Sequence, residues 1–79
     1  MLNVKVEMSG LLKVIEELRE EHGSINAAAR AIGMPQATLH NLYRGAEPTL
    51  DSLEMIARYR RQPLWKLMRD IEGNGKRTG

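Results

Sequence analysis

The chain has 79 residues, 12 Lys or Arg against 10 Asp or Glu, and no cysteine, which excludes disulfides and thiolate metal sites. Its length allows a single domain. No run of residues approaches the roughly 20 apolar residues that a membrane span requires, and Lys5 and Glu7 interrupt the one stretch that could be read as a signal peptide. We therefore expect a cytoplasmic protein without a membrane segment.

The charge is unevenly distributed along the chain. Residues 1–29 contain three Lys or Arg against five Glu, whereas residues 30–79 contain nine Lys or Arg against five Asp or Glu. A basic part of this kind favours partners that carry phosphate groups. An ordinary solvated surface explains the charge alone equally well.

Residues 1–8 form the first predicted segment. Its apolar residues alternate with polar ones, a period of two that is typical of a strand: Leu2, Val4, Val6 and Met8. A lone strand has no pairing partner in an otherwise helical chain. The segment is therefore expected to be a free arm or to pair with the same strand of a second subunit.

Two helices are predicted next from their caps. The first begins with Ser9 as its N-cap and ends just before Gly23. Ser24 is then the N-cap of a second helix over about 25–32, and Gly33 ends it. Three consecutive alanines in this second helix favour helix formation and let another helix approach closely.

The third predicted helix follows Pro35, which has no backbone donor to lose at a helix start. It runs to about Arg44, and Gly45 stops it. Leu39 and Leu42 are its predicted core pair. The residues left on its outer face are small, polar or cationic and include no carboxylate: Gln36, Ala37, Thr38, His40, Asn41 and Arg44.

Two further helices complete the prediction. Thr49 caps a fourth helix over about 50–60, with an apolar stripe of Leu50, Leu53, Ile56 and Ala57. Pro63 opens a fifth helix over about 63–72. The chain is thereby divided into an N-terminal arm or short strand, a compact all-α domain of five helices and a flexible basic tail, at 1–8, 9–72 and 73–79.

The segment from Ser24 to Gly45 resembles the helix-turn-helix of the lambda-repressor-like family of phage repressors, Cro proteins and bacterial relatives. The resemblance covers about residues 11–68. It rests on the joint spacing of Ala29, Ile32, Gly33, Thr38, Leu39, Arg44, Gly45, Pro48, Thr49, Leu50, Leu53, Ile56, Ala57, Leu64, Leu67 and Met68. The chain departs from the family at Pro35, where Ser or Thr often caps the recognition helix, and at Arg60 to Gln62, where the family has an apolar turn.

This resemblance implies a sequence-specific transcription regulator of the phage or mobile-element repressor type, which reads the DNA major groove with the helix at 36–44. The implied contacts to base edges are Gln36, Ala37 and Asn41, and those to the DNA backbone are Asn26, Thr38, His40 and Arg44. Glutamine and asparagine can bond adenine through two hydrogen bonds, and an alanine methyl can touch that of thymine. A homodimer would place two such helices about 34 Å apart on double-stranded DNA.

Trp65 lies out of phase with the apolar residues of the fifth helix, and we favour a dimer contact over a place at the core edge. Two alternatives to a repressor stay open, namely an antitoxin that binds both DNA and a toxin, and a helical module that binds only proteins. No catalytic motif or phosphate-binding glycine loop is present, so we expect no enzyme, cofactor or metal site.

Overall fold

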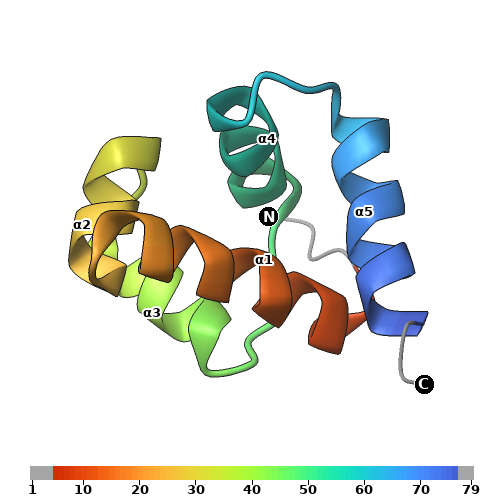
Figure 1. Cartoon of the computed structure of the whole chain (residues 1–79), viewed down its shortest axis with the longest axis horizontal. Helices are drawn as coiled ribbons and strands as arrows, with labels where there is room; N and C mark the ends of the chain where they lie inside the picture. The colour runs from red at the N-terminus through yellow and green to blue at the C-terminus, as the bar shows by residue number, and fades with distance from the viewer. Residues whose placement is uncertain (1–4, 77–79) are drawn as a thin grey trace.

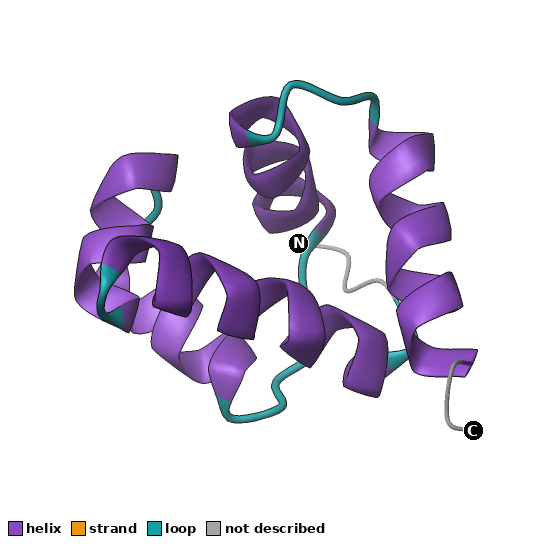
Figure 2. Cartoon of the chain, in the orientation of Figure 1, coloured by secondary structure: helices purple, strands orange, loops and turns teal. Residues whose placement is uncertain are grey.

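The computed structural model describes residues 5–76, with side chains described as far as residue 73. The elements of this part are five α-helices joined by short loops (Figure 2): α1 (Met8–His22), α2 (Ile25–Ile32), α3 (Gln36–Tyr43), α4 (Leu50–Tyr59) and α5 (Leu64–Lys76). The prediction of an all-α protein is therefore confirmed.

The other helices are arranged around α1 (Figure 1). This helix packs against α2, α3 and α5, whereas α4 packs against α2 and α5. The Cα atoms extend over 30 × 29 × 24 Å, so no helix projects far from the rest. In this arrangement α3 is supported by both α1 and α2 and leaves its remaining face outward.

The core is built from aliphatic side chains, as a sequence without phenylalanine requires. Large buried residues come from all five helices: Leu11, Val14, Ile15 and Leu18 from α1, Ile25 from α2, Leu39 and Leu42 from α3, Leu53 and Ile56 from α4, and Leu67 and Ile71 from α5. From α2 the core receives Ala28 and Ala29, both fully buried, and their small size lets α1 and α3 approach the α2 backbone closely.

Two of the predicted N-caps are confirmed. The Ser24 hydroxyl oxygen accepts a hydrogen bond from the backbone N–H of Ala27 at 3.0 Å. At the start of α4, Thr49 Oγ1 accepts from the backbone N–H of Ser52, and the Ser52 hydroxyl oxygen accepts from the backbone N–H of Thr49. This reciprocal capping box satisfies two backbone donors that would otherwise lack partners at the helix start.

The predicted cap of α1 is wrong. The backbone carbonyl of Glu7 already accepts from the N–H of Leu11 at 3.1 Å, so the helix begins at Met8 and Ser9 lies inside its first turn. There the Ser9 hydroxyl donates to the Glu7 carboxylate at 3.3 Å. Of the predicted N-terminal arm or strand, residues 5–7 are irregular and Met8 is helical, while residues 1–4 lie outside the described part.

The C-terminal helix is longer than predicted. It continues through Gly73 to Lys76, although the glycine-rich composition indicated a tail from residue 73. A glycine lowers helix stability by about 1 kcal/mol but keeps its backbone hydrogen bonds, so it does not by itself end a helix. Residues 77–79 of the predicted tail lie outside the described part.

The apolar stripe of α4 is also narrower than predicted. Leu50, the first residue of the helix, keeps 41% of its surface exposed, whereas Leu53, Ile56 and Ala57 are buried. A residue at the first helical position is not covered by a preceding turn of its own helix, so sequence periodicity alone does not fix its burial.

Candidate functional site

The outer face of α3 collects the predicted base-contacting residues. Gln36, Ala37 and Asn41 are all exposed, while Leu39 is fully buried and Leu42 nearly so. At 3.6 residues per turn, positions 36, 37, 40, 41 and 44 share one side of a helix. The structure therefore places two amides, a methyl group, an imidazole and a guanidinium on one continuous outward surface, which we call the α3 face and define as Gln36, Ala37, His40, Asn41 and Arg44.

The start of α3 is fixed by the turn that precedes it. Gly33 adopts a φ of 86°, a left-handed conformation that favours glycine, and its backbone N–H donates to the carbonyl of Ala29. Met34 is buried and anchors the turn in the core, although sequence periodicity did not identify it as a core residue. Pro35 occupies the N-cap position, and α3 has no side-chain cap.

Two residues predicted to contact the DNA backbone, Asn26 of α2 and His40 of α3, contact each other. The His40 Nε2 atom of α3 lies 2.7 Å from the Oδ1 atom of Asn26 on α2, and with this amide oxygen as acceptor the imidazole N–H donates. Asn26 is exposed and His40 half-buried, so both remain at the surface. This contact joins the middle of α3 to the first turn of α2. The sequence analysis gave the two residues only separate contacts to DNA and did not predict that they contact each other.

Two further residues were predicted to contact the DNA backbone. Thr38 is half-buried on α3, and Arg44 lies at the C-cap of the same helix. The Arg44 backbone N–H donates to the carbonyls of His40 and Asn41, which closes the helix. Its side chain is exposed. The Arg44 side chain is therefore accessible to solvent at the C-terminal edge of the α3 face.

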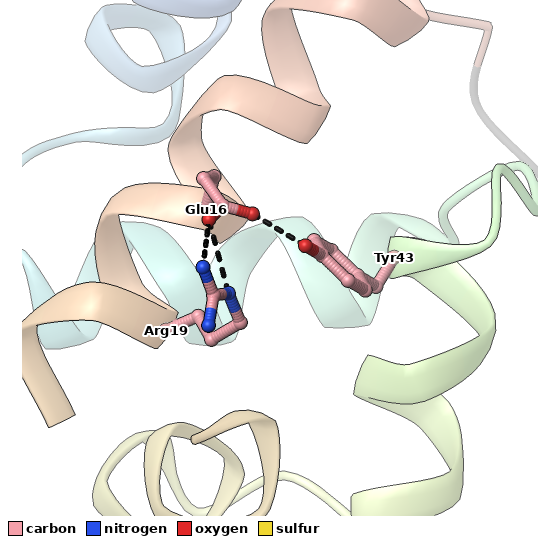
Figure 3. A network of polar contacts seen from close by, with 3 residues as sticks. All are labelled: Glu16, Arg19 and Tyr43. Carbon is pink, nitrogen blue, oxygen red and sulfur yellow. Dashed lines mark hydrogen bonds and ion pairs between the residues drawn. The ribbon is translucent and has the colours of Figure 1, made fainter. Parts of the chain in front are cut away.

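A polar network anchors the C-terminal end of α3 to α1 (Figure 3). The Tyr43 hydroxyl donates to Glu16 Oε2 at 2.5 Å, and Arg19 donates through Nε at 3.0 Å and through Nη2 to the other oxygen of the same carboxylate. These hydrogen bonds, Arg19 first and Tyr43 second, lower the pKa of Glu16, and the bond to Glu16 raises the pKa of Tyr43. No local signal in the sequence pairs Glu16 with a tyrosine 27 positions away, so sequence patterning does not predict this contact.

A second polar cluster joins the end of α1 to α4. His22 Nε2 and the Tyr59 hydroxyl oxygen are 2.6 Å apart, and the same hydroxyl donates to Glu21 Oε1 at 3.1 Å. Nearby, Arg60 and Glu17 form a longer ion pair of 3.8 Å. Burial, followed by the hydrogen bond to Glu21, raises the pKa of Tyr59. His22 thereby takes part in a contact between helices, with Tyr59 lying 37 positions away in the sequence.

Trp65 lies at the second position of α5 with 61% of its surface exposed. It is therefore not a residue of the core edge, which was one of the two interpretations of its phase in the sequence. The prediction of a dimer contact stays a prediction.

Comparisons with known proteins return no match, whether to family models, to curated proteins or to solved structures. None of the helices in the described residues is long and apolar enough to cross a membrane. Across the same part of the chain, no three His, Cys, Asp or Glu side chains are grouped so that they could hold a metal ion.

Proposed function

We propose that this protein is a sequence-specific DNA-binding transcription regulator of the phage or mobile-element repressor type, with α3 as the helix that enters the major groove. The observation that carries the proposal is the exposure of Gln36, Ala37 and Asn41 on one side of a helix whose Leu39 and Leu42 are buried. An α-helix fits the major groove of B-DNA, and an outward row of polar side chains is what reading base edges requires.

The chemistry of the α3 face suits this role. Gln36 and Asn41 can each donate and accept toward adenine, and the Ala37 methyl can contact a thymine methyl. Arg44 at the helix end can pair with phosphate, and no carboxylate on the α3 face would repel the DNA backbone. Two carboxylates of α1, those of Glu16 and Glu21, accept hydrogen bonds from Tyr43 and Tyr59.

Rigid mounting of α3 supports the same proposal. The helix is held in its middle by the contact between His40 and Asn26 and at its end by the bond from Tyr43 to Glu16. Because base contacts need fixed geometry, side chains on an anchored helix lose less conformational freedom on binding than side chains on a loop. Thr38 on α3 and Asn26 on α2 are assigned to the DNA backbone, where contacts set the register. Repression would follow from occupation of a promoter.

The test begins with selection of bound sequences from a pool of random duplexes, followed by titration of the selected site. We expect Gln36→Ala and Asn41→Ala each to weaken specific binding by about 1–3 kcal/mol and to leave binding of unrelated duplexes nearly unchanged. Arg44→Ala should weaken binding of every duplex and reduce the slope of log affinity against log salt by about 1.

Arg69→Ala is the matched control, because Arg69 is an exposed arginine of α5 that lies outside the α3 face. It should change neither specificity nor the salt slope. Unaltered specificity in both amide variants would refute the docking of α3. Lack of any enriched sequence together with lack of salt-dependent duplex binding would refute DNA binding altogether and favour a helical module that binds proteins.

A further inference from the structure

The contact between Asn26 and His40 fixes which nitrogen of the imidazole carries a proton. Helices α2 and α3 lie side by side (Figure 1), and His40 Nε2 is 2.7 Å from Asn26 Oδ1. An amide oxygen only accepts hydrogen bonds, so Nε2 is the protonated nitrogen and the neutral imidazole keeps its lone pair on Nδ1. A second proton on His40 therefore binds at Nδ1.

The Nδ1 atom of His40 is open to this second proton. It has no hydrogen-bond partner among the described residues and, unlike Gln62 Nε2, it is not a buried atom. An imidazolium ion donates through both of its nitrogens. Protonation therefore adds a donor and a positive charge at Nδ1 while the contact with Asn26 is kept.

The charged groups of the three helices that meet here leave such a charge without a partner. Along α2 and α3, the charged residues one helical turn from the contact are Arg30 and Arg44. Helix α1 brings Glu16 and Arg19 to α3, where both belong to the network of Figure 3. No carboxylate of the described part of the chain forms an ion pair with His40. An anion that neutralises a charge on His40 therefore has to come from another molecule.

We propose that Asn26 and His40 together form a proton-dependent phosphate site, so that DNA binding by α3 takes up a proton at His40 Nδ1. The inference rests on the proposed function and deepens it, because it joins two separate contacts into one site and makes the affinity depend on pH. The amide N–H groups of Asn26, which bond no other described residue, donate to the phosphate at every pH. The Nδ1–H group of His40 donates to it only when the imidazole is charged.

The direction of the pH effect follows from linkage. A phosphate beside the imidazole favours its charged form, so the complex keeps a proton that the free protein releases. The affinity therefore rises as the pH falls from 8 to 5.5, within the range where histidine ordinarily gains its proton. The chain has two histidines and no cysteine, so His22 is the other side chain expected to titrate there. Because the contact is to phosphate, selected and unrelated duplexes gain equally.

Titration of a fluorescently labelled duplex that carries the selected sequence, at pH 8 and at pH 5.5 and at several salt concentrations, tests the site. The wild type should bind roughly tenfold more tightly at pH 5.5. Its slope of log affinity against log salt should also be steeper there by about 1, since one more phosphate is neutralised. His40→Gln keeps an amide donor for Asn26 but takes up no proton, so its affinity and its slope should be nearly the same at both pH values.

A second variant tests whether the two residues act as one site. Asn26→Ala removes the acceptor that orients the imidazole as well as a donor to the phosphate. At pH 5.5 the effects of Asn26→Ala and His40→Gln on affinity should therefore not be additive in the double variant. Additive effects would show two separate contacts and overturn the joint site.

His22→Gln is the matched control, because it makes the same substitution at the other histidine, which contacts Tyr59 outside the α3 face. It should keep the full pH effect, and circular dichroism at both pH values verifies that each variant is folded. The proposal is overturned if the wild type binds equally at both pH values with one salt slope, or if His40→Gln keeps the rise in affinity. Either result leaves the docking of α3 standing, whereas a protein that binds no duplex at either pH overturns the proposed function as well.

Discussion

The two serines that the sequence marks as helix caps offer a direct test of how α2 is stabilised. Ser24 accepts a hydrogen bond from the N–H of Ala27 at 3.0 Å, whereas Ser9 lies inside α1 and bonds only the Glu7 carboxylate at 3.3 Å. Loss of a true N-cap costs about 1 kcal/mol, and glycine at the same position costs only a few tenths. Ser24→Ala should therefore destabilise the protein by about 1 kcal/mol, and Ser24→Gly by much less.

In a domain of this size, 1 kcal/mol corresponds to a decrease in Tm of about 4–8 °C. Ser9→Ala should change the stability by less than about 0.5 kcal/mol, because the site is exposed and alanine is the better helix former. Urea unfolding followed by circular dichroism at 222 nm, with one m-value shared by all variants, gives the differences in unfolding free energy. Equal losses in Ser9→Ala and Ser24→Ala, or a larger loss in Ser9→Ala, would refute the assignment of the caps.

Further predictions concern the support of α3. Leu39→Ala removes a fully buried side chain of α3 and should lower the unfolding free energy by about 2–5 kcal/mol in urea titrations, while the exposed Gln36→Ala should lower it by less than about 0.5 kcal/mol. Similar losses in the two variants would contradict the orientation of the helix. Absorbance at 295 nm should show both tyrosines ionising above their ordinary pKa of 10, because the bond to Glu16 raises that of Tyr43 and burial raises that of Tyr59. The folded state then keeps protons that the unfolded state loses, so stability falls as the pH rises above 10 through the raised values. Glu16→Gln should bring the pKa of Tyr43 closer to 10, and an unchanged titration curve would contradict the network in Figure 3.

Local signals predicted much of the fold. Helices α2 and α3 were located almost to the residue, because Ser24, Gly33 and Pro35 act through their own backbone chemistry and need no distant partner. Buried positions such as Leu39 and Leu42 followed from their spacing, since the period of an α-helix decides which side chains share a face. The same reasoning predicted that Gln36 and Asn41 would be exposed.

Long-range polar contacts were not predictable in this way. Tyr43 reaches Glu16 because α3 packs on α1, and Tyr59 approaches His22 because α4 is held against α2 and α5, so tertiary packing brings distant residues together. Composition does not indicate which side chains form such pairs. The errors at Ser9 and at the end of α5 have a different cause, because a cap residue or a glycine biases a helix boundary by about 1 kcal/mol and neighbouring backbone bonds can outweigh it.

The exposure of the single tryptophan has a practical consequence. With 61% of its surface open to solvent, the Trp65 indole stays in a largely aqueous environment after folding, so its fluorescence reports little about the core. Emission that shifts to the blue on titration, at constant circular dichroism, would instead signal that another molecule has covered this end of α5. The intrinsic fluorescence of Trp65 can therefore be used to follow association at this surface without an attached label.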